Sequence, residues 1–337
     1  MNILVALLPV LVLLALLQLM DSFKLVRTVT VIATIAAGAG VALVCLPLHG
    51  WLVNSSDLDL ALFTRYVAPA TEELAKGSVI LLLLFRRRIG FLVDAAVLGF
   101  AVGAGFALVE NIDYLWHLPD ASLALWLVRG LGTAVLHGAT TAVFAMLTKA
   151  MIERPGRQLA VAAVPGLALA VAIHAAFNHV LLPPLAMTGL LLLILPLVIV
   201  VVFRQSERAT RDWFGSGLDL DVELLALVQS ELFVSTRFGA YLQELRARFG
   251  GVIAADMFCL LRLDLEISVQ AKALLLAREA GMNLPVSDDL HAGLREVAYL
   301  QSSIGRTGLL ALKPLQVVSD RDRWHRYLLA DAARGRV

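Results

Sequence analysis

The most constraining feature of this chain is a series of apolar stretches that are each long enough to cross a membrane as a helix. A hydrocarbon layer of ~30 Å needs about 20 helical residues. Charged residues make up only 16% of the chain, against roughly 25% in soluble domains. The sequence therefore predicts an all-α, polytopic membrane bundle of about seven transmembrane helices, at 2–20, 28–47, 62–85, 90–116, 122–148, 158–182 and 185–203.

The loops between these stretches indicate an orientation. Lysine and arginine follow the first, third, fifth and seventh stretches, whereas the connections at 48–59, 117–121 and 183–184 contain neither. Because cytoplasmic loops carry the excess of positive charge, we expect the amino terminus outside and the carboxyl-terminal part in the cytoplasm, in a bacterial cell membrane. The first stretch has no basic leader and no clear cleavage site, so we interpret it as a retained signal-anchor rather than a signal peptide.

We expect three parts: a transmembrane domain at 1–203, a charged, glycine-containing linker at 204–220 and a helical cytoplasmic domain at 221–337. In the last part, apolar residues at helical spacing predict helices at 221–235, 238–249, 252–279, 287–300 and 320–333.

Composition also limits the partners and the chemistry. The net charge of +1 offers no basic field for phosphates, so nucleic acid is not an expected partner. Cys45 and Cys259 form neither a disulfide pattern nor a CxxC pair. We expect both cysteines to be buried and reduced.

Polar side chains inside the apolar stretches are the main functional signal, because a charge at membrane depth costs at least ~3 kcal/mol. They occur on four stretches: Glu72, Glu73 and Lys76; Asp94, Glu110, Asn111 and Asp113; Arg129 and His137; and His174, Asn178 and His179. Residues four apart share a helix face. Glu72 therefore stacks with Lys76, His174 stacks with Asn178, and Arg129, Thr133, His137 and Thr141 form one stripe.

Turning any of these four polar faces toward lipid would leave polar groups unsatisfied. At ~1.5 Å per helical residue, Glu72, Glu110, His137 and His174 all lie at or beyond the midplane, counted from the cytoplasmic ends. We expect the four faces to meet in one hydrated cavity in the outer part of the bilayer.

Four motifs, each on its own stretch, resemble those of the PrsW family of intramembrane proteases. They are Ala70-Thr71-Glu72-Glu73-Leu74-Ala75-Lys76-Gly77; Val93-Asp94 through Gly103-Ala104-Gly105-Phe106-Ala107-Leu108-Val109-Glu110-Asn111; His137; and His174-Ala-Ala-Phe-Asn178. They stand in family order, and the resemblance covers roughly residues 30–203. It implies a glutamic-type peptidase related to the wider CAAX-endopeptidase and abortive-infection group.

The resemblance also implies roles. Glu72 or Glu73 would be the base that activates water, Glu110 a second-motif partner, His137 an auxiliary polar group, and His174 with Asn178 the oxyanion side. Lys76, Phe106 and Asn111 would support them. Some family members make the first cut in a membrane-anchored anti-sigma factor, so the implied partners are a membrane-anchored protein substrate and the surrounding lipid.

The chemistry of the set is compatible with peptide hydrolysis, which needs a base for water, an acid for the leaving amine and donors for the oxyanion. No serine or cysteine lies in a nucleophile motif, which favours direct attack by water without a cofactor. A metal-dependent protease is an alternative, because two histidines and three glutamates could bind zinc even though HExxH is absent.

Two functions without proteolysis stay open as well. One is a transporter with an intramembrane proton relay, although no internal repeat is evident, and the second is a non-catalytic receptor that holds a partner helix. Plainer interpretations of the residues also stay open: an intrahelical ion pair with Lys76, helix packing by His137, and a headgroup position for Glu110 and Asn111. We interpret Asp94, Arg129 and His179 as structural.

Overall fold

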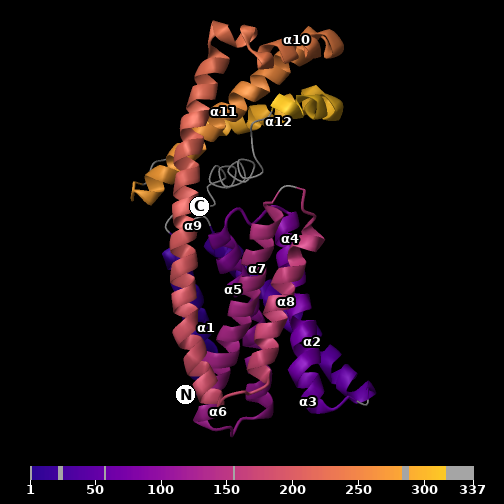
Figure 1. Cartoon of the computed structure of the whole chain (residues 1–337), viewed down its shortest axis with the longest axis vertical. Helices are drawn as coiled ribbons and strands as arrows, with labels where there is room; N and C mark the ends of the chain where they lie inside the picture. Colours follow the sequence, from indigo (N-terminus) through magenta and orange to yellow (C-terminus); the bar gives the residue numbers. More distant parts are fainter. Residues whose placement is uncertain (1, 22–25, 57, 155, 283–287, 316–337) are drawn as a thin grey trace. The chain divides into compact units, whose positions relative to one another are not determined.

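The computed structural model describes residues 2–21, 26–56, 58–154, 156–282 and 288–315 (Figure 1). These residues form helices joined by short connections and contain no strand. The chain divides into two compact units, Met1–Glu207 and Arg208–Val337. The elements of the first are α1 (Asn2–Met20), α2 (Thr28–Ser55), α3 (Leu60–Leu62), the π-helix η1 (Phe63–Val67), α4 (Ala68–Phe85), α5 (Leu92–His117), α6 (Leu123–Leu127), the π-helix η2 (Val128–Thr133), α7 (Ala134–Ile152), α8 (Leu159–Asn178) and the first part of α9 (Pro184–Gln229).

A helical membrane bundle is confirmed. Among the described residues, five helices are long and apolar enough to cross a membrane: α1, α2, α5, the continuous run Leu123–Ile152, and α8. The sequence predicted about seven. The two remaining stretches are helical as well, but α4 carries three charged side chains, and the apolar part of α9 is the shorter segment Pro184–Leu195.

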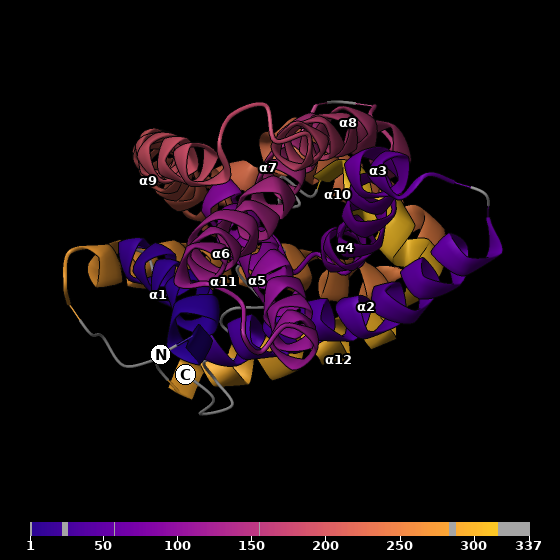
Figure 2. The same cartoon turned by 90° about the horizontal axis from the view of Figure 1, so that it is seen from below.

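Helix α5 lies in the middle of the first unit, between α2 and α7 (Figure 2). Glycines let the backbones approach closely, as is common between helices in lipid. A Cβ atom added to Gly38 of α2 would lie 2.0 Å from the Val102 carbonyl oxygen of α5, and one added to Gly103 would lie 2.1 Å from the His137 carbonyl oxygen of α7. These contacts fix the level at which α5 and α7 present their polar side chains.

Replacing Gly38 by alanine is expected to destabilise the bundle by about 2 kcal/mol, because overpacking against a backbone carbonyl forces α2 and α5 apart. Gly40 on the same helix provides the matched control, since a Cβ there would meet nothing within 4 Å. Gly40→Ala should be neutral or slightly stabilising. Thermal unfolding in detergent measures both, and equal melting temperatures would contradict the packing argument.

The second unit is helical, as expected. It contains the end of α9, the 3-10 helices η3 (Glu231–Ser235) and η4 (Lys313–Leu315), α10 (Arg237–Phe249), α11 (Gly251–Glu279) and α12 (Asp288–Leu312). Helix α11 packs against both α10 and α12 (Figure 1). Helix α12 continues beyond the expected end at residue 300, with a kink at Gly305, where φ is 69°. The expected helix at 320–333 lies outside the described residues.

The structure adds detail to the expected linker and differs from the expectation for one cysteine. Residues 204–220, expected as a linker, belong to the continuous helix α9, because they contain no proline and isolated glycines cost a helix only about 1 kcal/mol each. Cys45 is buried as expected, whereas Cys259 is exposed, because it lies on a face of α11 that the described residues leave uncovered.

Candidate active site

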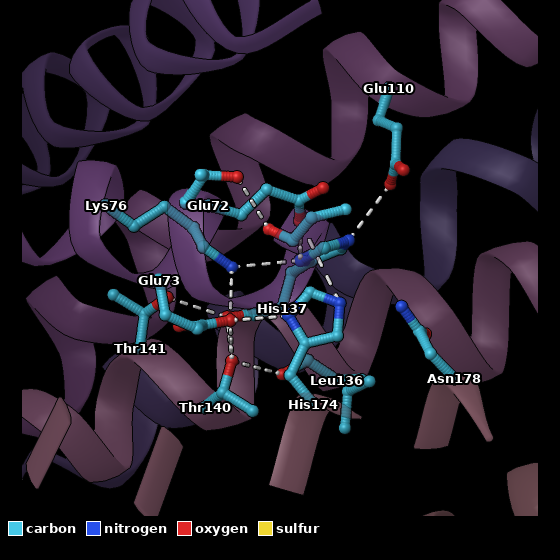
Figure 3. A network of polar contacts seen from close by, with 12 residues as sticks. Glu72, Glu73, Lys76, Glu110, Leu136, His137, Thr140, Thr141, His174 and Asn178 are labelled. Atoms are coloured by element: carbon cyan, nitrogen blue, oxygen red, sulfur yellow. Dashed lines mark hydrogen bonds and ion pairs between the residues drawn. The ribbon is translucent and has the colours of Figure 1, made fainter. Parts of the chain in front are cut away.

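Four helices bring their polar side chains to one place (Figure 3). Glu72, Glu73 and Lys76 come from the first turns of α4, whereas Glu110 lies near the end of α5. His137 lies in the first turn of α7 and His174 in the last turns of α8. Successive helices run in alternating directions. The starts of α4 and α7 therefore lie at the same level as the ends of α5 and α8.

Glu73 is the centre of the hydrogen-bond network (Figure 3). Its Oε1 atom accepts from Lys76 Nζ at 2.6 Å and from Thr140 Oγ1 at 2.9 Å, and it lies 2.8 Å from His174 Nδ1. An ionised carboxylate only accepts hydrogen bonds, so His174 donates through Nδ1 and its Nε2 keeps a free lone pair. Glu73 therefore fixes the orientation of the His174 ring.

Glu72 faces the space between the two imidazole rings. Its Oε2 atom is buried without a hydrogen-bond partner among the described residues. This oxygen lies 3.8 Å from His137 Nδ1 and 3.8 Å from His174 Nε2. The two rings are edge-to-face, with centroids 4.9 Å apart. A buried carboxylate oxygen beside two imidazoles is suited to bind a proton, a water or a cation.

His137 connects α7 to both α4 and α5. Its Nε2 lies 2.9 Å from Glu110 Oε2, and its Nδ1 lies 3.0 Å from Lys76 Nζ. Since the carboxylate accepts, Nε2 carries the proton and Nδ1 receives the hydrogen bond from the ammonium. Phe106 packs against His137 with centroids 5.1 Å apart, and Lys76 Nζ lies 4.9 Å from the Phe106 ring centre. The aromatic ring closes one side of this fully buried ammonium.

The charges of the site leave Glu72 unbalanced. Glu73 pairs with Lys76, and Glu110 lies 2.9 Å from Arg129 Nη2. In the described structure, Glu72 is within ion-pair distance only of histidines. With three carboxylates and two cations, Glu72 is the carboxylate that pairs with neither cation.

The sequence analysis did not single out two neighbours of the site, His49 and Thr140, and it interpreted a third, Arg129, as structural. His49 was assigned to a loop, but α2 continues to Ser55. Its Nε2 contacts Thr71 Oγ1 at 2.8 Å and its Nδ1 lies 3.9 Å from Glu72 Oε1. The apolar Trp51-Leu52-Val53 after His49 was the available signal for the longer helix.

Thr140 lies three residues after His137, and its hydroxyl donates to Glu73. Thr141, which belongs to the predicted stripe, donates to the His137 carbonyl instead (Figure 3). Arg129 was interpreted as structural because no motif supports it. It pairs directly with Glu110, so it belongs to the polar network of the site.

Asn178 does not join the network. Its side-chain amide donates to the Thr64 carbonyl in η1 at 2.9 Å, and Figure 3 shows it beside His174 without a contact to that ring. Because Asn178 is the last residue of α8, its side chain turns toward η1. The neighbouring His179 contacts the Tyr66 hydroxyl at 3.0 Å.

Glu110, Asn111 and Asp94 lie within the bundle, whereas the Asp113 side chain is exposed and pairs with His117. The Glu110 side chain is 16% exposed and Asn111 is 1% exposed, so both side chains face the interior of the protein. Asp94 accepts the backbone N–H groups of Gly90 and Phe91 at 2.8 and 2.9 Å, which caps the start of α5.

The residues present fit a divalent metal ion. One donor atom from each of Glu72, His137 and His174 lies within 4.8 Å of the others. Tetrahedral zinc, with ligand bonds of ~2.1 Å, separates its ligand atoms by about 3.4 Å. The two separations that involve Glu72 Oε2 are 3.8 Å and need only a small contraction. This oxygen is buried without a hydrogen-bond partner among the described residues, and such an ion would satisfy it.

The chain matches the model of a known protein family. Residues 24–203 match the family model described as PrsW family intramembrane metalloprotease, which spans more than half of the chain and contains all the residues of the network described above. No curated protein and no solved structure matches the chain.

Proposed function

Because the chain belongs to the PrsW family of intramembrane metalloproteases, we propose that it is a peptidase that cleaves a membrane-anchored protein by activated water. The observation that carries this proposal is the free carboxylate of Glu72, which faces His137 and His174 at 3.8 Å inside a buried network. Water activation needs a base that is not already neutralised, and Glu72 is the carboxylate of this site that meets that condition.

We assign different roles to the adjacent glutamates. Without a metal, Glu72 takes the proton from the attacking water and passes it to the leaving amine, as a general base and then a general acid; with a metal bound, Glu72 would instead be the carboxylate ligand. Glu73 positions His174 and neutralises Lys76. Glu110 positions His137 by accepting from its Nε2. Asn178, which the resemblance assigned to the oxyanion side, would first have to leave the Thr64 carbonyl.

The donor set favours the metal-dependent mechanism that the sequence left open. Glu72, His137 and His174 would hold the ion, which we propose to be zinc. Carboxylates behind both histidines, Glu110 and Glu73, provide the support that metal-bound imidazoles usually have. A bound zinc ion supplies Lewis acidity and activates water at neutral pH. Lys76 occupies His137 Nδ1 and would compete for that nitrogen.

We propose a single-span, membrane-anchored protein as substrate, with an anti-sigma factor as the first candidate to test. The positive charges in the loops support an orientation with the amino terminus outside. In that orientation the site lies in the outer part of a bacterial cell membrane, and the unit Arg208–Val337 lies in the cytoplasm.

Comparative membrane proteomics tests this function. Cells that make the wild-type protein and cells that make Glu72→Gln should differ in at least one single-span protein, which persists uncut in the variant. Adding that protein to the purified peptidase in lipid vesicles should reproduce the cut. Binding of the candidate substrate without cleavage would favour a receptor, and identical proteomes would contradict the proposal.

A further inference from the structure

A chain of polar contacts runs from the backbone of α1 to His137. Asn111 donates from Nδ2 to the Ala6 carbonyl oxygen at 2.7 Å. Its Oδ1 accepts from Arg129 Nε at 3.1 Å. Arg129 Nη2 lies 2.9 Å from Glu110 Oε2, which is itself 2.9 Å from His137 Nε2. Four contacts thus connect the first helix to an imidazole of the site.

Each contact in this chain fixes the next side chain. The bond to the Ala6 carbonyl orients the amide of Asn111, so that its oxygen faces Arg129. The guanidinium then has three partners, because it also lies over the Tyr114 ring at 3.7 Å. Held in this way, the guanidinium presents its charge to the Glu110 carboxylate, with which Nη2 forms an ion pair but no hydrogen bond. Arg129 therefore determines where the Glu110 carboxylate meets His137.

Helix α1 is packed closely enough to act as a fixed support. Ala6 and Val10 are fully buried. A Cβ added to Gly130 of η2 would lie 1.8 Å from the Val5 carbonyl oxygen. Pro9 has no N–H for the Val5 carbonyl one turn earlier. The backbone of α1 thus touches the segment that carries Arg129, although α1 lies outside the family match at 24–203.

We propose that α1 is a positioning element of the active site, acting through Ala6, Asn111, Arg129 and Glu110 on His137. This inference rests on the proposed function and adds a component that the matched family region does not contain. When the contact between α1 and Asn111 is lost, Glu110 and His137 lose their fixed geometry. The turnover number then falls and the metal is held less tightly, while substrate binding changes little.

Two substitutions in the full-length protein test this inference. Asn111→Leu removes the polar link at similar volume, and Gly130→Ala pushes α1 away from η2. Each should lower kcat at least tenfold, leave KM within about twofold, and weaken zinc binding about 10- to 100-fold, as changes behind metal ligands do. The controls are Asp113→Asn, which alters an exposed pair with His117, and Gly189→Ala, where a Cβ meets nothing within 4 Å. Both controls should behave like the wild type.

A double-mutant cycle separates positioning from general destabilisation. If both substitutions break the same link, their effects on kcat should be strongly non-additive. Additive effects, or wild-type kcat and zinc affinity in Asn111→Leu, would overturn the inference even if the wild type cleaves its substrate. If Gly130→Ala does not fold, Asn111→Leu decides alone. If the wild type and Glu72→Gln are equally inactive, the proposed function fails, and zinc affinity still tests the role of α1.

Discussion

Replacing Glu72 by glutamine is expected to reduce peptide cleavage by about 10³-fold while leaving the protein folded, within the range that general acid–base groups contribute. Glutamine keeps the shape of the side chain but can neither accept a proton from water nor supply a carboxylate ligand to a metal ion. Because Glu72 balances no lysine or arginine in the described structure, its loss breaks no strong ion pair. The measurement is the rate of substrate cleavage in lipid vesicles, with the melting temperature as a check on folding.

Glu73→Gln is the matched comparison for Glu72→Gln, because it makes the same chemical change at the next residue of the chain. It removes the charge that pairs with Lys76 and orients His174. An unpaired buried ammonium should destabilise the protein by about 3–5 kcal/mol. Loss of stability for Glu73→Gln and loss of chemistry for Glu72→Gln would support the two roles. A stable but inactive Glu73→Gln beside an active Glu72→Gln would reverse them.

The sequence predicted the convergence of polar faces for a physical reason. Glu72, Glu110, His137 and His174 lie in apolar helices, and groups of this kind avoid lipid. Because the helices run in alternating directions, residues near the start of one helix lie at the same level as residues near the end of the next. The structure brings these four side chains together in one network. The catalytic use of the network stays a prediction.

The sequence could not predict which side chains face the site, because this depends on how each helix is rotated and on where it ends. Glu72 and Glu73 are about 100° apart on α4, so only the positions of α7 and α8 decide which one faces the imidazoles. Asn178 shares a face with His174 by spacing, but the end of α8 at this residue directs it to Thr64. Arg129 shares a face with His137 by spacing, but its contacts with Glu110 and Asn111 depend on the position of α5, which no local pattern reveals.

Removal of bound metal is the second change with a large expected effect. The purified protein should contain about one zinc ion per chain, and a strong chelator should lower cleavage by at least about 10³-fold, with recovery when zinc is restored. Zinc at about a thousand times its Kd should also stabilise the fold by roughly 4 kcal/mol, because it binds only the folded state. Elemental analysis and thermal unfolding, with and without chelator, measure both effects.

Substitutions then identify the ligands. His174→Ala and His137→Ala should each abolish zinc binding, because two remaining donors hold the ion poorly. His179→Ala provides the control: this neighbouring histidine contacts the Tyr66 hydroxyl and lies outside the donor group, so zinc content should not change. Full cleavage by a protein free of zinc would contradict the metal-dependent mechanism. It would leave water activation by Glu72 alone, and the same assay on Glu72→Gln would then decide whether any peptidase chemistry depends on this carboxylate.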